Sequence, residues 1–400
     1  MKEIQLAHGG GGEEMNELLQ RLFEVFDERV LKEANDAAIV DFSQNNGLNL
    51  DENLSVAHNG DLNSNSNANL AHKGDIHLIQ NANLTHKGKL NSNEKAHLTQ
   101  SNLNLSAYSN AKANLSDKFA ISTDSFTLSP IFLDDEVNIG KLCVCGSVND
   151  VLMVGAVPEF LSLAFIIEEG LDFAKLEKII HSIKKECDKA GVKVVCGDTK
   201  VVPKGKGDEI YINTTAFGRV IKPCETKNIR NGLSVLISGD IGRHGAAVLV
   251  QRNAIEAQVK SDCKCLKDEV MSLLRKNVEL IAMRDATRGG LSAVLNEWAR
   301  QSGCDILVYE EKIIVKDEVK GICELFGFEA LELANEGTFA LCVAKKDEQK
   351  ALQILRKFNE NASIIGEVLE SQKARVLLQN AYGAKRFLES PKGELLPRIC

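Results

Sequence analysis

The sequence predicts a protein of two domains, each built from α/β or α+β layers. In both halves of the chain, apolar runs of strand length alternate with amphipathic runs of helix length. This pattern breaks near Lys222–Asn228, a possible linker, and restarts at Leu233. The length of 400 residues exceeds what one compact core accommodates, and the composition, 44% hydrophobic and 26% charged, is typical of globular proteins.

The expected N-terminal domain opens with a glycine run and a helix. The helix is predicted from apolar residues at three- and four-residue spacing, namely Met15, Leu18, Leu19, Leu22, Phe23 and Phe26. Further strands are expected at Asn35–Asp41, Phe119–Asp124, Phe160–Ile167, Val192–Cys196 and Tyr211–Phe217, with helices at Ile139–Gly155 and Asp172–Ala190. We place this domain at residues 1–44 and 117–222.

The expected C-terminal domain spans residues 228–388, with a polar tail at 389–400. Its first strand, Leu233–Ser238, leads through a glycine-rich turn into a helix. A second glycine turn, Met283–Leu291, opens another helix, and the apolar strand Thr338–Val343 follows the lone acid Glu336.

A 14-residue repeat interrupts the N-terminal domain at 45–116. The copies begin at Asn53, Asn67, Asn81 and Lys95, the last one decayed. Asn, Ser and His dominate, and the apolar content is too low to offset the entropy of ordering, so we expect a disordered insertion. An alternative is a His-rich segment that binds metal, with His58, His72 and His86 at one repeat position.

Charge, hydropathy and cysteine usage exclude several classes of protein. The net charge of −8 argues against a nucleic-acid-binding face. No run of 18 apolar residues indicates a membrane span, and the N-terminus has no signal-peptide pattern. Eleven scattered cysteines favour free thiols in a cytoplasmic protein over a disulfide framework.

Four acids stand at the ends of expected elements in the N-terminal domain: Asp36, Asp124, Asp150 and Asp198. Mg²⁺ takes carboxylate and phosphate oxygens, so a converging set of this kind suits Mg·ATP. Gly197–Lys200 follows an apolar strand directly and offers an acid for metal and a lysine for phosphate. A capping or turn role remains the alternative for each of these residues.

Glycines and cysteines supply the remaining candidates. The run Gly9, Gly10, Gly11 and Gly12 precedes a helix and is either an anion-binding arm or a flexible terminus. The pairs Cys143/Cys145 and Cys263/Cys265 lack the spacing of a zinc site and are interpreted as packing residues. Cys400 lies on a polar tail, as an accidental residue or as a thiol that reaches an active site.

Several motifs together resemble the HypE family of hydrogenase maturation proteins, which are carbamoyl dehydratases. They are LAHGGGGEEM, STDSFTLSPIF, IGKLCVCGSVNDVLMVGAVP, LSLAFIIEEG, GVKVVCGDTKVVPKGKGD, INTT, MRDATRGGL, ANEG and PRIC. The resemblance covers nearly the whole chain except 45–116. The wider superfamily includes aminoimidazole-ribonucleotide synthetase, selenophosphate synthetase and thiamine-phosphate kinase.

The resemblance implies a fold and a reaction. An ATP-binding α/β domain would pair its strands with a second subunit in a homodimer, followed by an α+β C-terminal domain. The carbamoyltransferase HypF would load a carbamoyl group onto Cys400. ATP would then drive its dehydration to a protein thiocyanate, and a HypC–HypD scaffold would receive the cyano group on iron.

The resemblance also implies roles for individual residues. Mg²⁺ would be held by Asp36, Asp124, Asp150 and Asp198, and ATP would contact Gly9, Gly10, Gly11, Gly12, Asn149, Gly197 and Thr199. Lys200 would act on phosphate and oxygen, and Glu336 on the proton of the carboxamide. Asn35 stands where relatives often have a second acid, and the insertion is no feature of the family.

Two alternatives remain. The first is a related enzyme that activates the amide of a free small molecule. The second is a nickel- or zinc-binding accessory protein that acts through its His-rich insertion.

Overall fold

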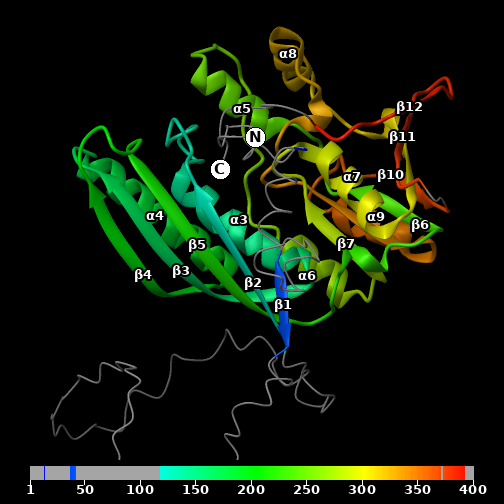
Figure 1. The fold of residues 1–400 in the computed structure, drawn as a ribbon, viewed down its shortest axis with the longest axis horizontal. Coiled ribbons are helices and arrows are strands. Elements are labelled where there is room, and N and C mark those ends of the chain that lie inside the picture. The colour runs from blue at the N-terminus through cyan, green and yellow to red at the C-terminus, as the bar shows by residue number, and fades with distance from the viewer. Residues whose placement is uncertain (1–12, 14–36, 42–117, 371–372, 392–400) are drawn as a thin grey trace, which may run out of the picture. The chain divides into compact units, whose positions relative to one another are not determined.

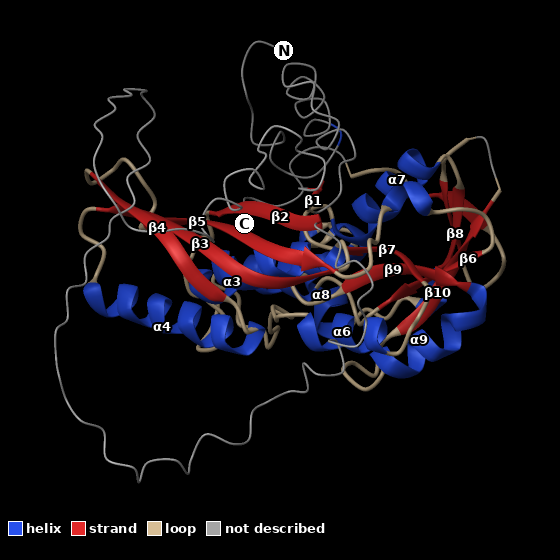
Figure 2. Ribbon diagram, turned by 90° about the horizontal axis from the view of Figure 1, so that it is seen from below, coloured by secondary structure: helices blue, strands red, loops and turns tan. Residues whose placement is uncertain are grey.

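Two β-sheets with helices packed on them form the described part of the chain (Figures 1 and 2). The computed structural model describes Glu13 and residues 37–41, 118–370 and 373–391, which belong to one unit, Met1–Ser43 with Ser116–Cys400. The expected helix over residues 15–26 and the insertion at 45–116 lie outside the described residues.

The first sheet has the strand order β1-β2-β5-β3-β4. Its strands are β1 (Ala38–Asp41), β2 (Lys118–Phe126), β3 (Ala156–Glu168), β4 (Lys193–Val202) and β5 (Ile210–Val220). Neighbours are antiparallel except β3 and β4, which are parallel and joined through a helix. Helices α3 (Ile139–Met153) and α4 (Phe173–Ala190) cover one face of this sheet (Figure 2).

Helix α3 is buried on nearly every side, which its small and apolar residues permit. The Asn138 side chain caps it by accepting hydrogen bonds from the N–H groups of Gly140 and Lys141. Gly140 lets α4 approach, because a Cβ there would lie 2.5 Å from the Ile179 carbonyl oxygen. The helix therefore fills the space between the sheet and α4.

Helix α4 is amphipathic, as its sequence pattern predicts. Asp172 caps its start, and Gly191 ends it with a left-handed φ of 65°. Ile179 and Ile183 are buried, whereas Ile180 is 45% exposed and lies off the buried stripe.

The second sheet has the order β12-β11-β8-β10-β6-β9-β7. Its strands are β6 (Leu233–Ile237), β7 (Leu280–Asp285), β8 (Asp305–Tyr309), β9 (Phe339–Ala344), β10 (Ser363–Leu369), β11 (Val376–Gln379) and β12 (Lys385–Phe387). The helices are α5 (Arg243–Arg252), α6 (Lys267–Arg275), α7 (Gly290–Ser302), α8 (Asp317–Phe326) and α9 (Glu348–Leu355). Short 3₁₀ helices are Thr226–Asn228, Glu310–Lys312, Ala330–Glu332 and Lys345–Asp347.

A continuous apolar core joins the two sheets. It includes Val148 of α3, Val270 of α6 and Phe339 of β9, all fully buried. The segment between the sheets is packed against them: Lys222 Nζ donates to the Val278 carbonyl at 2.8 Å, and Cys224 is buried. The expected linker is therefore a fixed connection.

One expected boundary is wrong. The strand expected at Val192–Cys196 runs on to Val202, so Gly197–Lys200 lies within β4 and not in a turn after it. The reason is the parallel partner β3, which supplies main-chain hydrogen bonds over the whole stretch and outweighs the low strand propensity of Gly and Asp.

Candidate active site

Two of the candidate metal-binding acids face the interval between β2 and α3. Asp124 lies on β2, and the Ser147 hydroxyl of α3 donates to its Oδ2 at 3.5 Å. Asp150 lies further along α3 and accepts a hydrogen bond of 2.5 Å from the Ser122 hydroxyl on β2. The two carboxylates are therefore held on the same side of the sheet, where they can serve one metal–phosphate group.

Asn149, which we expected to contact the nucleotide, binds main chain in the structure. Its Nδ2 donates to the Lys264 carbonyl at 3.1 Å, and its Oδ1 accepts from the Leu266 N–H at 2.9 Å. The side chain is 1% exposed. Both polar atoms of the amide thus bind main chain of the C-terminal domain, and Asn149 clamps that segment to α3.

Asp198 and Lys200 lie on the opposite face of the first sheet. Asp198 pairs across β3 with Asn213, the neighbour of Thr214, whose hydroxyl donates to the Cys143 carbonyl of α3. Because side chains alternate along a strand, Asp198 and Lys200 point away from the helices. They form an ion pair of 3.5 Å, with side chains 64% and 70% exposed.

Asp198 therefore does not converge with Asp124 and Asp150 within one chain. Strand β4 lies three positions from β2 in the sheet, which at 4.7–4.9 Å per strand is about 14 Å. Gly197 is explained by packing, because a Cβ would lie 2.2 Å from the Leu163 carbonyl oxygen. Thr199 is exposed on the same edge strand.

Glu336 lies where three glycine-containing loops meet, and it is 2% exposed. Its neighbour Asn335 holds the loops together: Oδ1 accepts from the Gly242 N–H at 2.6 Å, and Nδ2 donates to the Ala286 carbonyl at 3.0 Å. A single side chain thus joins three loops: the loop after β6, the loop after β7 and the loop before β9. This fixes the position of the acid in the fold.

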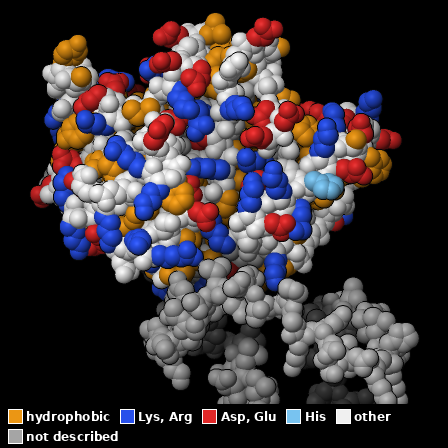
Figure 3. Space-filling view, turned by 180° about the vertical axis from the view of Figure 1, so that it is seen from behind, with side chains coloured by type: hydrophobic (Ala, Val, Ile, Leu, Met, Phe, Trp, Pro, Cys, Tyr) orange, Lys and Arg blue, Asp and Glu red, His pale blue; other side chains and the backbone are white. Residues whose placement is uncertain are grey.

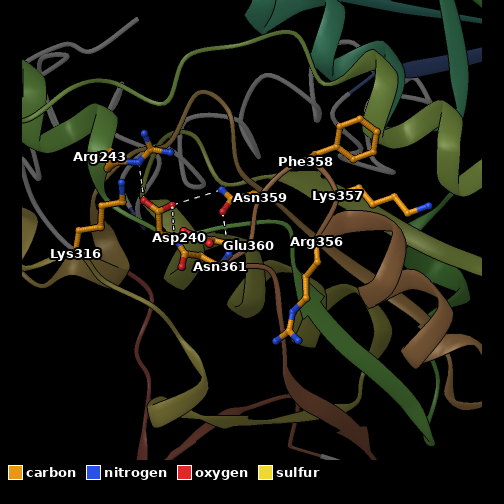
Figure 4. Close-up of a pocket in the computed structure, with 9 residues that line it drawn as sticks. All are labelled: Asp240, Arg243, Lys316, Arg356, Lys357, Phe358, Asn359, Glu360 and Asn361. Atoms are coloured by element: carbon orange, nitrogen blue, oxygen red, sulfur yellow. Dashed lines mark hydrogen bonds and ion pairs between the residues drawn. The ribbon is translucent and has the colours of Figure 1, made fainter.

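Beside these loops a cavity of about 380 Å³ contains a network around Asp240 (Figure 4). Asp240 is bound by Arg243 at 2.5 Å and by the amides of Asn361 and Asn359 at 3.2 and 3.4 Å. Burial raises the pKa of Asp240, but Arg243, the hydrogen bond from Asn361 and the charge of Lys316 outweigh it and leave the pKa below its usual value. The network holds Arg243 in place at the start of α5.

The remaining candidate residues, Gly9, Gly10, Gly11, Gly12, Asp36 and Cys400, lie outside the described residues. Within residues 37–41, 118–370 and 373–391, no three His, Cys, Asp or Glu side chains gather to hold a metal ion. Cys143, Cys145 and Cys263 are buried free thiols, and Cys265 is partly buried.

Sequence reasoning named Asn335 only as part of the motif ANEG, without a role of its own, and missed Asp262. Asp262 accepts hydrogen bonds from the main chain on both sides of the Glu336 carbonyl. Asp262 and Glu336 are 74 positions apart in the sequence, so no local spacing links them. Only the sequence SDC, a polar and acidic turn before a helix, marks the place.

The distribution of charge and the length of the helices can be described for part of the chain. Basic and acidic side chains are interspersed on the face shown in Figure 3. Among the residues that the structure describes, no helix combines the length and apolarity needed to cross a bilayer.

Comparison with known proteins identifies the family of this chain. Residues 109–220 match the N-terminal domain, and 230–379 the C-terminal domain, of AIR synthase related proteins. The carbamoyl dehydratase HypE of Escherichia coli K12 is 40% identical over 290 residues, 71% of this chain and 85% of that protein. The chain belongs to the HypE family. Strands β2 to β5 lie within the first matched domain and β6 to β11 within the second.

Solved HypE structures share the fold. One in a HypE–HypF complex has a TM-score of 0.66 and 40% identity, covering 72% of this chain and 98% of that one. Another, in complex with ATP, has a TM-score of 0.68 and 31% identity, covering all of both chains. The mixed α/β architecture expected from the sequence is therefore confirmed.

Proposed function

We propose that this protein is an ATP-dependent carbamoyl dehydratase that acts on its own Cys400. It converts an S-carbamoyl group there into a thiocyanate, the source of the cyanide ligand of nickel–iron hydrogenase. One observation carries the proposal: the chain matches 85% of the E. coli carbamoyl dehydratase at 40% identity. Glu336, a buried acid on a fixed loop, supplies the base that such a reaction requires.

ATP and Mg²⁺ are the proposed co-reactant and metal. A HypE homologue has been solved with ATP. Mg²⁺ in phosphoryl-transfer sites is bound by one or two carboxylates together with phosphates and water, and Asp124 and Asp150 provide such a pair between β2 and α3. Asp36 would complete the set from the segment before β1. The metal would supply charge neutralisation at the phosphates.

The reaction needs a better leaving group and the loss of two N–H protons. The carboxamide oxygen attacks the γ-phosphorus of ATP, an O–P bond forms, and ADP leaves. One N–H proton is lost as the C=N bond forms. Cleavage of the C–O bond then releases phosphate as the second N–H proton leaves, giving C≡N. Lys200 stabilises the phosphoryl oxygens and the carboxamide oxygen, and Glu336 accepts a proton.

We propose further that the site is completed by a second subunit. Lys200 and Asp198 lie on the face and edge of the sheet opposite to Asp124, so one chain cannot bring them to the same phosphate. In the described residues β4 has a strand partner only on its β3 side. Phe160 and Ile166 on that open face are 42% and 45% exposed, as a surface covered by a partner sheet would be.

The partners follow from the chemistry and the comparisons. HypF is the proposed carbamoyl donor, since a HypE relative has been solved in complex with it. A HypC–HypD scaffold is the proposed acceptor of the cyano group. A reducing compartment such as the cytoplasm suits a thiol substrate, and the ten cysteines of the described residues are free.

Mass spectrometry of the intact chain tests the proposal. After carbamoylation by HypF, addition of Mg·ATP should remove about 18 Da, the mass of one water, from a peptide that contains Cys400. The Cys400→Ala variant should show neither adduct. A dehydrated adduct on another residue, or ATP consumption with a free small molecule that survives Cys400→Ala, would refute the assignment.

A further inference from the structure

One carboxylate holds the main chain on both sides of the Glu336 carbonyl. Asp262 Oδ1 accepts from the Glu336 N–H at 3.1 Å, and Oδ2 accepts from the Gly337 N–H at 3.0 Å. The Glu336 carbonyl in turn accepts from the Lys264 N–H at 3.3 Å. Every polar main-chain atom of Glu336, and the next N–H, is thus bound by residues 262–264.

The contact is close and shielded from water. Asp262 is 5% exposed, and a Cβ at Gly337 would lie 1.9 Å from the Asp262 carbonyl oxygen. Burial raises the pKa of Asp262, while Arg243 and the two N–H groups act against that rise. Both carboxylate oxygens accept hydrogen bonds from main-chain N–H groups, and the amide of an asparagine could supply only one of these two acceptors.

The segment that carries Asp262 is anchored independently of Glu336. The Asn149 amide binds it twice, at Lys264 and Leu266. The Ser261 hydroxyl pairs with His244 Nδ1 at 2.8 Å. The segment is therefore a fixed support attached to α3, the helix that also carries Asp150.

We propose that Asp262 is a positioning residue for the reaction: it fixes the Glu336 carboxylate where it accepts a proton from the phosphorylated carboxamide. This inference rests on the proposed function and names a determinant of its proton-transfer step. Because both peptide planes of Glu336 are held, the position from which its side chain extends is fixed. A rigid support of this kind keeps the base within reach of the proton.

The test uses the isosteric variant Asp262→Asn in the full-length protein. Its NH₂ group must face one of the two main-chain N–H donors, so that hydrogen bond is lost and the loop shifts. Displacement of a catalytic group by about 1 Å costs about 100-fold in rate, so we expect about that loss in thiocyanate formation at saturating ATP. The KM for ATP should stay within about twofold, because the phosphate-binding residues are untouched.

Glu269→Gln is the matched control. Glu269 is a buried carboxylate of the same segment, but its partner is Lys264 Nζ at 2.7 Å. Its replacement should destabilise the segment comparably and keep the rate within about threefold. If Asp262→Asn does not fold, Asp262→Ser, which leaves one acceptor and adds no amide donor, carries the same expectation.

Combination with Glu336→Gln separates positioning from a structural role. With the base already removed, Asp262→Asn should lower the residual rate no further, whereas a structural defect would lower it by the same factor again. Equal rates for Asp262→Asn and Glu269→Gln, or additive losses, would overturn the inference. If the wild-type protein forms no thiocyanate at all, the proposed function fails first, and the role of Asp262 falls with it.

Discussion

A mixture of two inactive variants, Lys200→Ala and Glu336→Gln, is predicted to recover about a quarter of the wild-type rate. The reason is the separation described above. Lys200 lies on the exposed face of β4, about 14 Å across the sheet from β2. Glu336 is tied through Lys264 and Asn149 to α3 on the other face. We therefore expect a site that uses both side chains to take them from two subunits, as in the dimer proposed above.

The magnitude follows from random assortment of subunits. Equal amounts of the two variants give about half mixed dimers, and each mixed dimer has one site with both side chains intact and one with neither. Half of the dimers with half of their sites active gives about one quarter of wild-type activity. If both side chains came from the same chain, every site would lack one of them, and the mixture would stay inactive.

The assay mixes carbamoylated variants under subunit exchange and follows thiocyanate formation on Cys400 by mass spectrometry. Native mass spectrometry of the mixture is the control for exchange itself, because a mixed dimer has a mass between those of the two homodimers. Absence of recovery after demonstrated exchange would refute the composite site, and with it the reasoning from sheet position. Lys200 would then have to reach the phosphate within its own subunit.

Three further predictions concern stability and the insertion. Burial and Arg252 lower the pKa of His244 to about 3, so below pH about 6.5 the unfolded chain binds a proton that the folded chain excludes. From pH 7 to 5 the free energy of unfolding, measured in urea, should therefore fall by about 2 kcal/mol more in wild type than in His244→Gln. Asn149→Ala leaves two buried main-chain groups unpaired and should lower the free energy of unfolding by about 2–4 kcal/mol. Asn296→Ala is the control: the Asn296 side chain hydrogen-bonds only within α7, and its loss should cost less than about 1 kcal/mol. A variant lacking residues 45–116 should form thiocyanate at a rate within about twofold of the full-length protein. If the deletion abolishes both this activity and the binding of nickel or zinc, the metal-binding alternative is favoured instead.

The elements of the fold were predictable where one periodicity dominates. The helix over Ile139–Gly155 ends two residues earlier than expected, and the strand at Tyr211–Phe217 extends by one residue before and three after. In these places burial of one continuous set of side chains decides the structure. At Gly197–Lys200 the residue types favour a turn. The segment is a strand because it pairs with β3, whose residues lie about 35 positions away in the sequence.

The candidate site was only partly predictable, because its geometry depends on partners distant in sequence. The acid Glu336 stands out beside glycine, but its support, Asp262, depends on a loop that only the folded chain brings near. Asn149, next to Asp150, suggests a ligand until the main chain at Lys264 and Leu266 is in place. A sequence motif identifies which residues are chemically able to act, and tertiary contacts decide which of them are already engaged.

The pairing of β1 with β2 has a consequence for how this chain can vary in length. Asp41 and Lys118 are partners in the antiparallel ladder, so the chain leaves and re-enters the sheet at adjacent positions. The sequence predicts a disordered insertion at this point, and for a disordered loop of about 75 residues one more 14-residue copy adds only about 0.15 kcal/mol of closure entropy. Tandem duplication at this point is therefore nearly invisible to folding stability. A change in the number of repeats would therefore leave the pairing of β1 with β2 intact.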